Sequence, residues 1–553
     1  MNMIKIEGTC ILLLLSLISI GCNQQGGADV PTPTGIRSTS LISYQDLLRA
    51  EENPDDWLMY SGSYRSRRYS RLSQIGRNNL DELRLRWAYQ IKSFEKFETT
   101  PLVVDGTMFI TRPPAGVTAL DSRTGREFWS YDRRLPGRIS TCCGLVNRGL
   151  AILGDKVYMG TLDAHLIALD WKTGAVVWDT KVADYDAGYS ITVAPLVVKD
   201  KIVVGISGGE FGIRGFLDAY DSETGKRVWR FYTIPAPGEP GSETWSGNAW
   251  KTGGGPTWTN GSFDPELDLI YWGTGNPAPD WYGDERPGDN LYTASVIALE
   301  ADTGKLDWHF QFTPHDTHDW DANQIPVLAS GEYQGQKRQV LLWGNRNGFF
   351  YVLDRKTGEF LLAKAFVRQT WTEGMDDQGR PILKPGIEPS EKGSLVYPGN
   401  QGGTNWYSPS YSPRTKLFYL SVWDIPSIFF SSPPVYQPGT PFYGRLYQPS
   451  AEDPGYGAVK ALNSQTGEMQ WEYRLHTEPH AGIQSGLLST ATDVLFGGTM
   501  QGQFFVLDAV TGEELWVTHL GGNIIAGPIT YLSENKQQVS IAAGNSIFTF
   551  GLD

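Results

Sequence analysis

The eight residues 314–321 combine three carboxylates with two imidazoles and one indole, a composition that is suited to chemistry. Side chains two residues apart on an extended segment point the same way, so Asp319 and Asp321 are expected to face one target. A proton acceptor placed beside a hard cation would use such a pair. The alternative is a polar loop that aspartates cap, and these residues alone leave both interpretations open.

Seven turns related to the pattern D-x-x-T-G recur along the chain, and six of them are followed by a Trp four residues after the Gly. In this pattern Asp caps the turn, Gly takes the positive φ, and the Trp packs between neighbouring sheets. The typical spacing of about 50 residues fits one four-stranded blade of a β-propeller. The turn glycines are Gly125, Gly174, Gly225, Gly304, Gly358, Gly467 and Gly512.

Two further strands complete the predicted architecture. Trp87 lies in an apolar strand that no such turn precedes, and residues 546–551 form a strand that no Trp follows. Joined in one sheet, they would make an eighth blade and leave no open edge. The predicted fold class is therefore all-β, an eight-bladed β-propeller with Trp-docking repeats. Three Gly- and Pro-rich insertions, 235–255, 368–405 and 426–457, are expected to build or cover a site on one face.

The N-terminal region predicts export. Residues 11–20 form an apolar run that is too short to cross a bilayer and is typical of a signal segment. The sequence Ser-Ile-Gly-Cys at 19–22 resembles a bacterial lipoprotein processing site, although Leu is usual where Ser19 stands. The expectation is either a lipid anchor at Cys22 or ordinary cleavage, and periplasmic localisation in both cases.

Three regions follow from these patterns. Residues 1–22 are the signal peptide, 23–55 a tether with a short helix at 44–52, and 56–553 the propeller. The net charge of −14 argues against nucleic acid as a partner. The short basic runs 65–71 and 133–138 are interpreted as solvated faces or ion pairs between blades.

Outside the signal region the chain has two cysteines, Cys142 and Cys143, which are adjacent. An exported protein meets an oxidising compartment, so the pair is expected to form a disulfide. Two buried free thiols are the alternative. No C-x-x-C-H motif occurs, so no haem site is predicted and electrons would leave to a separate acceptor.

The repeat, the adjacent cysteines and the H-D-x-x-D-x-D stretch together resemble the quinoprotein alcohol dehydrogenases, which include the methanol dehydrogenases. The resemblance runs from residue 56 to the end of the chain. It implies an eight-bladed propeller that binds pyrroloquinoline quinone (PQQ) and one metal ion in the periplasm. It also implies oxidation of a small alcohol by hydride transfer to the quinone, with a c-type cytochrome as electron acceptor.

The resemblance also implies how the cofactor is held. Cys142 and Cys143 would form a flat disulfide against one face of PQQ, and Trp258 would stack on the other. Arg148 would bind a carboxylate of PQQ, and Arg346 its quinone oxygens. Any one of these residues could instead serve only the structure. The implied cofactor-binding residues are Glu98, Cys142, Cys143, Arg148, Thr192, Ser207, Trp258, Arg346 and Asn405.

The same resemblance implies a metal site made of Glu210, Asn276, Asp319 and Asp321, with Asp319 also acting as the catalytic base and Arg346 as a catalytic residue. An acidic residue at position 321 is typical of the lanthanide-dependent members, because an extra carboxylate favours a trivalent cation. A lanthanide(III) ion is therefore the preferred metal, and Ca²⁺ is the alternative.

Substrate identity is less constrained. Gln484 stands where relatives often have Trp, and a late Trp is missing around Ala543. A PQQ-dependent sugar or aldehyde dehydrogenase on the same scaffold is one alternative function. Another is a lipid-anchored, non-catalytic propeller of the outer-membrane assembly type. A homodimer is a further expectation.

Overall fold

The computed structural model describes residue 36 and residues 41–475 and 485–553. The predicted signal peptide, with Cys22, lies outside the described residues, and so does Gln484. The predicted helix at 44–52 is present but shorter, since α1 spans Tyr44–Leu48 after a Ser43 cap. No helix in the described part of the chain is long and apolar enough to cross a membrane.

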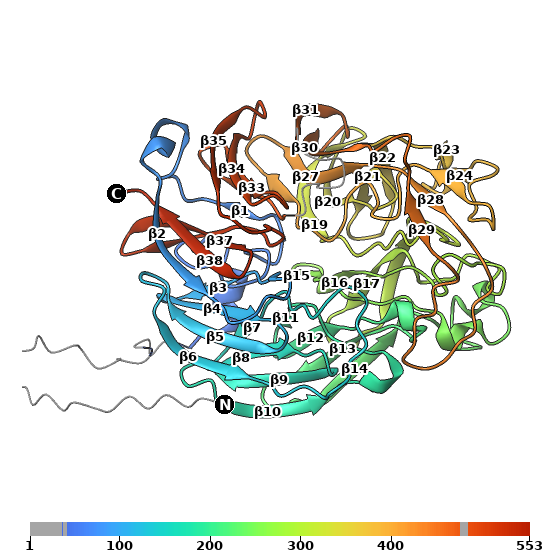
Figure 1. Ribbon diagram of the computed structural model, residues 1–553, viewed down its shortest axis with the longest axis horizontal. Helices are drawn as coiled ribbons and strands as arrows, with labels where there is room; N and C mark the ends of the chain where they lie inside the picture. The colour runs from blue at the N-terminus through green and yellow to red at the C-terminus, as the bar shows by residue number, and fades with distance from the viewer. Residues whose placement is uncertain (1–35, 37–40, 476–484) are drawn as a thin grey trace, which may run out of the picture.

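β-Strands dominate the described residues, and most belong to antiparallel sheets of four strands (Figure 1). The first three sheets contain β3 (Leu102–Val104), β4 (Thr107–Arg112), β5 (Gly116–Asp121) and β6 (Glu127–Asp132); β7 (Ala151–Leu153), β8 (Lys156–Gly160), β9 (His165–Asp170) and β10 (Val176–Lys181); and β11 (Leu196–Val198), β12 (Lys201–Gly205), β13 (Phe216–Asp221) and β14 (Arg227–Tyr232).

The next three sheets continue in chain order. They contain β15 (Ser262–Asp264), β16 (Leu269–Gly273), β17 (Ser295–Glu300) and β18 (Leu306–Gln311); β19 (Val327–Tyr333), β20 (Gln336–Gly344), β21 (Phe349–Asp354) and β22 (Phe360–Ala365); and β26 (Ser410–Ser412), β27 (Leu417–Asp424), β30 (Tyr456–Asn463) and β31 (Met469–Arg474).

Two sheets combine strands from both ends of the chain. One contains β2 (Arg84–Gln90), β38 (Ser546–Gly551), β37 (Lys536–Ala543) and β36 (Ile529–Ser533); the other contains β32 (Leu488–Thr490), β33 (Val494–Gly498), β34 (Gln503–Asp508) and β35 (Glu514–His519), with β1 (Tyr69–Ser70) parallel to β32. β2 pairs antiparallel with β38 along its length, and Figure 1 shows these blue and red strands side by side. The molecule is a β-propeller whose sheets follow one another around a common centre.

Two smaller sheets lie in the predicted insertions. β23 (Thr372–Met375) pairs with β24 (Pro381–Leu383), and β28 (Ser427–Phe429) joins β25 (Ser394–Val396) to β29 (Tyr447–Pro449). The insertions 368–405 and 426–457 therefore fold against each other, because β25 belongs to the first and β28 and β29 to the second.

The recurring turns adopt the predicted geometry. Asp121 Oδ1 accepts hydrogen bonds from the backbone N–H groups of Arg123 and Thr124, at 2.9 and 3.0 Å. The seven turn glycines have φ between 67° and 76°. Six of them lie so close to a Trp of the preceding repeat that an added Cβ would come within 2.7 Å of the ring. The seventh, Gly467, faces Lys364 and Leu362, and Leu362 stands at the Trp position of its repeat.

The same tryptophans also connect neighbouring sheets by hydrogen bonds. Trp87 Nε1 donates to the Ser122 carbonyl at 3.1 Å, and Trp229 Nε1 donates to the Ala301 carbonyl at 3.1 Å. An apolar ring and one directional bond thus fix one sheet to the next at each of Trp87, Trp129, Trp178, Trp229 and Trp471. This arrangement holds the loops at the sheet ends in a defined relation.

Arg68, in the basic run 65–71, corrects the interpretation of that run as solvated or ion-paired. Its side chain is buried at 1% exposure and donates to the backbone carbonyls of Leu487, Tyr60 and Pro528. A buried guanidinium is tolerated there because its N–H groups meet carbonyl oxygens from distant parts of the chain.

Gly304→Ala tests the Trp docking. The substitution is expected to lower the free energy of unfolding by about 3 kcal/mol, because the methyl group would meet the Trp229 ring at 2.5 Å. Gly106→Ala is the matched control, since Gly106 has a similar φ of 76° but nothing within 4 Å of the added Cβ. The control is expected to lose about 1 kcal/mol. Equal losses in denaturant unfolding would contradict a docking role.

Candidate functional site

A cavity of about 790 Å³ receives side chains from parts of the chain that are far apart in sequence. Twelve of the thirteen predicted site residues line it: Glu98, Cys142, Cys143, Arg148, Thr192, Ser207, Glu210, Trp258, Asp319, Asp321, Arg346 and Asn405. Asn276 does not line the cavity and is buried at 4% exposure.

Two of the three predicted insertions contribute to this cavity. Insertion 368–405 supplies lining residues between Gly399 and Asn405, and insertion 426–457 supplies others between Pro426 and Pro449. Among the described residues that line the cavity, none comes from insertion 235–255, which instead contacts the site from behind the lining, since the Gly255 N–H donates to the Asn276 carbonyl at 2.9 Å. A Gly- and Pro-rich composition identifies a loop, but it does not indicate which way the loop folds.

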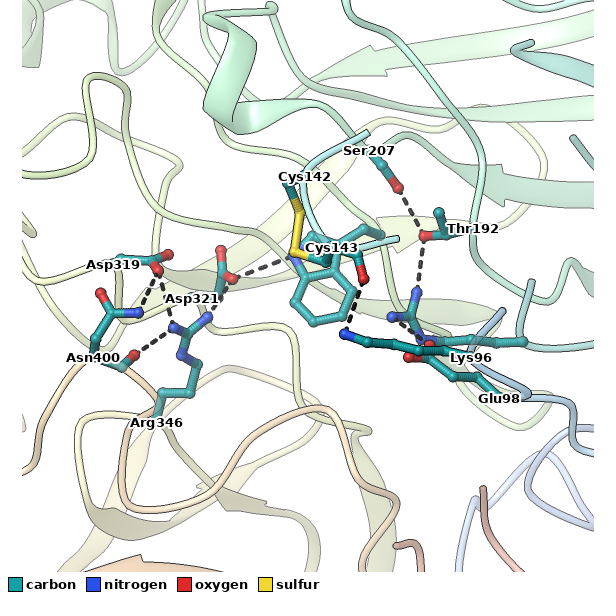
Figure 2. The surroundings of a disulfide bond; sticks show 12 residues. Lys96, Glu98, Cys142, Cys143, Thr192, Ser207, Asp319, Asp321, Arg346 and Asn400 are labelled. Carbon is teal, nitrogen blue, oxygen red and sulfur yellow. Dashed lines mark hydrogen bonds and ion pairs between the residues drawn. A yellow bond between two sulfur atoms is a disulfide. The ribbon is translucent and has the colours of Figure 1, made fainter. Parts of the chain in front are cut away.

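Arg346 joins the two carboxylates that were expected to act together. Its Nη1 lies 2.6 Å from Asp321 Oδ2, and its Nη2 lies 3.2 Å from Asp319 Oδ2 (Figure 2). Asp321 also accepts hydrogen bonds from Trp258 Nε1 at 3.3 Å and from the Asn276 backbone N–H at 2.8 Å. Asp321 is therefore fixed from three directions.

The loop that carries Asp319 is not the extended segment assumed from the sequence. Asp319 has a φ of 59°, in the left-handed region. Asp316 holds the loop, since its carboxylate accepts hydrogen bonds from the backbone N–H groups of His318 at 3.1 Å and Trp320 at 2.8 Å. Asp319 and Asp321 do face one group, the Arg346 guanidinium, as expected. A capped turn, and not an extended segment, brings them together.

The aromatic residues of this loop connect it to insertion 368–405. The rings of His318 and Trp320 stack at 4.5 Å between centroids. Trp320 Nε1 donates to the Gly399 carbonyl at 3.0 Å, and His318 Nε2 lies 3.0 Å from the Ile387 carbonyl. These contacts give His318 and Trp320 a structural role, which is to hold the Asp319 loop against the insertion.

Asn400 was not predicted and lies at the centre of the carboxylate cluster. Its Nδ2 donates to Asp319 Oδ2 at 3.2 Å, and its backbone carbonyl accepts from Arg346 Nη2 at 2.6 Å. Its Oδ1 accepts from Trp281 Nε1 at 3.1 Å. Asn400 thus orients both the candidate base and the arginine, and no motif in the sequence indicated it.

The predicted disulfide between Cys142 and Cys143 is present and faces the cavity. Lys96 Nζ donates to the Cys143 carbonyl at 3.1 Å. Figure 2 shows Asp319, Asp321 and Arg346 on one side of the disulfide in this view, and Glu98 and Thr192 on the other.

Glu210, in the short 3-10 helix η3 (Gly209–Phe211), lies close to the disulfide. One of its carboxylate oxygens and both sulfur atoms lie within 4.8 Å of one another. Disulfide sulfurs carry no charge, so these three atoms do not form a metal site by themselves. Within the described part of the chain, the predicted ligands Glu210, Asp319 and Asp321 do not come together as closely.

Arg148 forms the other end of the cavity. Its Nη2 lies 2.8 Å from Glu98 Oε2, and its Nη1 donates to Thr192 Oγ1 at 2.8 Å. Its guanidinium lies over the rings of Trp258 and Trp406, at 5.0 and 4.5 Å from their centroids. The predicted residues Glu98, Arg148, Thr192 and Trp258 therefore meet at one place, and the neighbouring Trp406 was missed.

Burial dominates the electrostatics of the acidic end. It raises the pKa of Glu210 to about 7, with the Asp321 charge adding to the effect. Burial also raises the pKa of Asp319 well above its ordinary value, against the opposing effect of Arg346. Burial likewise raises the pKa of Asp321. Carboxylates that are costly to ionise in isolation are suited to binding a cation that compensates them.

The residues fit the cofactor and metal that the sequence predicts. The cavity holds the carboxylates of Glu210, Asp280, Asp319 and Asp321 but, at that end, the guanidinium of Arg346 alone, so a cation of high charge would balance it. At the other end, Arg148 Nε is buried without a hydrogen-bond partner in the described residues, which leaves donor capacity for an anionic group. The aromatic rings between the two ends suit a flat ligand.

Comparisons with known proteins show what this chain is similar to. The model of the PQQ glucose/ethanol/alcohol dehydrogenase β-propeller domain matches residues 57–363 and 363–539. The quinoprotein alcohol dehydrogenase PedH of Pseudomonas putida is 38% identical over 536 residues, covering 91% of this chain and 89% of its own. The lanthanide-dependent methanol dehydrogenase of Methylacidiphilum fumariolicum is 38% identical over 547 residues, covering 92% and 88%. A solved europium-containing methanol dehydrogenase has a TM-score of 0.87 at 34% identity, covering 92% of this chain and 100% of that one.

Glu210→Gln tests the electrostatics in the metal-free protein. Because the pKa of Glu210 in the folded protein, about 7, exceeds its ordinary value of 4.5, its contribution to stability is present at low pH and is lost as pH rises through 7. At pH 8 the variant is expected to be more stable than the wild type by up to about 3 kcal/mol. At pH 4.5 the two should unfold alike. A pH-independent difference in thermal unfolding would contradict this assignment.

Proposed function

Because this chain belongs to the PQQ-dependent glucose, ethanol and alcohol dehydrogenase family, we propose that it oxidises an alcohol to an aldehyde with PQQ as the oxidant. The observation that carries the proposal is the placement of Asp319, Arg346 and Asp321 in one cavity with the Cys142–Cys143 disulfide. A non-catalytic scaffold would have no need for a buried carboxylate cluster beside an exposed disulfide.

The two ends of the cavity would bind different parts of the cofactor. Arg148 and Thr192 would bind its carboxylates, because a guanidinium fork matches that group. Trp258 and the disulfide would flank its rings, and Arg346 would donate to its quinone oxygens. When bound, PQQ accepts the hydride from the carbinol carbon, and a metal ion increases the electrophilicity of its carbonyl.

Asp319 would take the proton of the substrate hydroxyl. The O–H bond breaks, the proton moves to a carboxylate oxygen of Asp319, and the C=O bond of the aldehyde forms as the hydride leaves. Asn400 and Arg346 hold Asp319 Oδ2, each at 3.2 Å, so the orientation of the base is set before the substrate binds. Arg346 and Asn400 are buried, and the exclusion of water around them strengthens these interactions.

We propose a lanthanide(III) ion as the metal, held by Glu210, Asn276, Asp319 and Asp321, with Ca²⁺ as the alternative. The Asn276 backbone N–H donates to Asp321 at 2.8 Å, and its Nδ2 donates to the Pro277 carbonyl at 3.2 Å. Its amide oxygen remains available as a ligand. The carboxylates exceed the guanidinium charge at this end of the cavity, which favours a trivalent over a divalent ion.

Several further features of the proposal rest on the sequence. A separate c-type cytochrome would accept the electrons, and the protein would act in the periplasm, with a lipid anchor at Cys22 or a cleaved signal. The eight larger sheets would be the blades of one closed ring. A sugar or aldehyde substrate is the second candidate, because the family description includes glucose dehydrogenases.

Reconstitution tests the proposed function. Apo-protein supplied with PQQ and La³⁺ is expected to gain quinone absorbance and dye-linked alcohol oxidation, and Ca²⁺ should support less activity. Absence of both signals with either metal would contradict the enzyme assignment. Equal activity with Ca²⁺ and La³⁺ would contradict the preference for a trivalent ion.

Asp321→Ala tests the metal assignment more directly. Loss of this carboxylate is expected to weaken La³⁺ binding at least tenfold, measured by titration of the PQQ-loaded protein, while Ca²⁺ binding changes less. Comparable weakening for both ions would show that Asp321 does not discriminate between them.

Asp319→Asn tests the base. The amide keeps the size of the side chain but cannot accept the proton, so kcat should fall by about 10²–10⁴-fold. Quinone absorbance should persist, because the cofactor contacts remain. Retention of more than a tenth of the wild-type kcat would contradict the role of Asp319 as base.

A further inference from the structure

Asp280 is a carboxylate of the cavity that has no role in the mechanism above. Its side chain is buried at 1% exposure and lines the same cavity as Asp319. Its Oδ1 is buried and has no hydrogen-bond partner among the described residues. A buried carboxylate oxygen without a donor is unfavourable, so this atom is expected to meet a donor that the protein itself does not supply.

The residues on both sides of Asp280 are tied to the loop that carries the base. The buried Arg286 donates through one nitrogen, Nη2, to the carbonyls of Pro279 at 3.1 Å and Asp316 at 2.6 Å. The backbone just before Asp280 is therefore bound to the start of the Asp319 loop.

The second connection follows Asp280. Trp281 Nε1 donates to Asn400 Oδ1, and Asn400 Nδ2 donates to Asp319 Oδ2. These two links connect the residues on both sides of Asp280 to the Asp319 loop, and the Asp319 charge is the strongest of the neighbouring charges that raise the pKa of Asp280.

The nearby cations are already engaged. Arg346 binds Asp319, Asp321 and the Asn400 carbonyl. Arg286 uses its Nη atoms on backbone carbonyls and on Asn290. Among the described residues, neither guanidinium forms an ion pair with Asp280, so the carboxylate that lines the cavity is not neutralised by an arginine.

We propose that Asp280 binds the substrate by accepting a hydrogen bond from a second hydroxyl, next to the carbinol that Asp319 deprotonates. The preferred substrates are therefore vicinal diols. This inference rests on the proposed function, because it assumes that the alcohol reacts at Asp319. An ammonium group would also donate, but it would be repelled by the metal ion proposed for the same cavity, so the neutral hydroxyl is assigned.

Ethylene glycol and 1-propanol provide the test, because they differ only by a hydroxyl in place of a methyl group. The wild-type holoenzyme is expected to have the higher kcat/KM on ethylene glycol. A site that binds a hydroxyl through a buried polar group discriminates strongly against an analogue that lacks it. Asp280→Leu, which replaces the carboxylate by an apolar group of similar shape, should reduce the ethylene glycol/1-propanol ratio by about 10²-fold.

Two further variants make the test specific. Asp280→Asn keeps the shape of the side chain but offers a weaker, neutral acceptor, and should lower the ethylene glycol/1-propanol ratio by about tenfold. This variant tests the proposal if the Leu variant does not fold. Asp284→Leu removes an exposed carboxylate from the same loop and should leave the ratio unchanged.

Three results would overturn the proposal. One is a wild-type preference for 1-propanol, and another is a ratio that neither Asp280 variant changes. The third is loss of quinone absorbance or of La³⁺ binding in Asp280→Asn, which would assign Asp280 to the cofactor or metal. Activity on simple alcohols without diol preference refutes this inference alone, whereas failure of the wild type to oxidise any alcohol refutes the proposed function with it.

Discussion

The excess of buried negative charge at one end of the cavity is the constraint on which the site depends. Asp319 and Asp321 share one guanidinium, that of Arg346, and their carboxylates remain costly to ionise because they are buried. Such a cluster is stable only if its surroundings hold each group in place or if a cation compensates it. The protein does the first through hydrogen bonds, and the proposed metal would do the second.

The propeller supplies the rigidity that this charge requires. Six tryptophans dock on the turn glycine of the next repeat, so neighbouring sheets are fixed by close contact, as with Trp229 and Gly304. Because the sheets are fixed, the loops at their ends are also held in defined positions. Arg286 and Asn400 then connect loops from different sheets by hydrogen bonds to backbone and side-chain atoms.

Much of the fold could be predicted because its signal is local. The turn Asp, the positive-φ Gly and the Trp four residues later are close in sequence, and the structure places all three as expected. The contacts of the site are different. Asn400 lies 81 residues from Asp319, and its amide could be assigned to the site only once the insertion had folded. Insertion 235–255, with a similar composition, contributes nothing to the described cavity lining.

The sequence by itself predicted the β-propeller and the disulfide, because repeats and adjacent cysteines encode local geometry and residue chemistry directly, and the family resemblance implied twelve of the residues that line the cavity. The tertiary structure alone decided that Asp319 takes a left-handed conformation and that Asp280 lines the cavity with one buried oxygen that has no hydrogen-bond partner in the described residues. The physical reason is that hydrogen-bond satisfaction and burial are properties of the assembled neighbourhood. The residue type determines which groups a side chain can bind, and the fold determines which of its atoms are left without a partner.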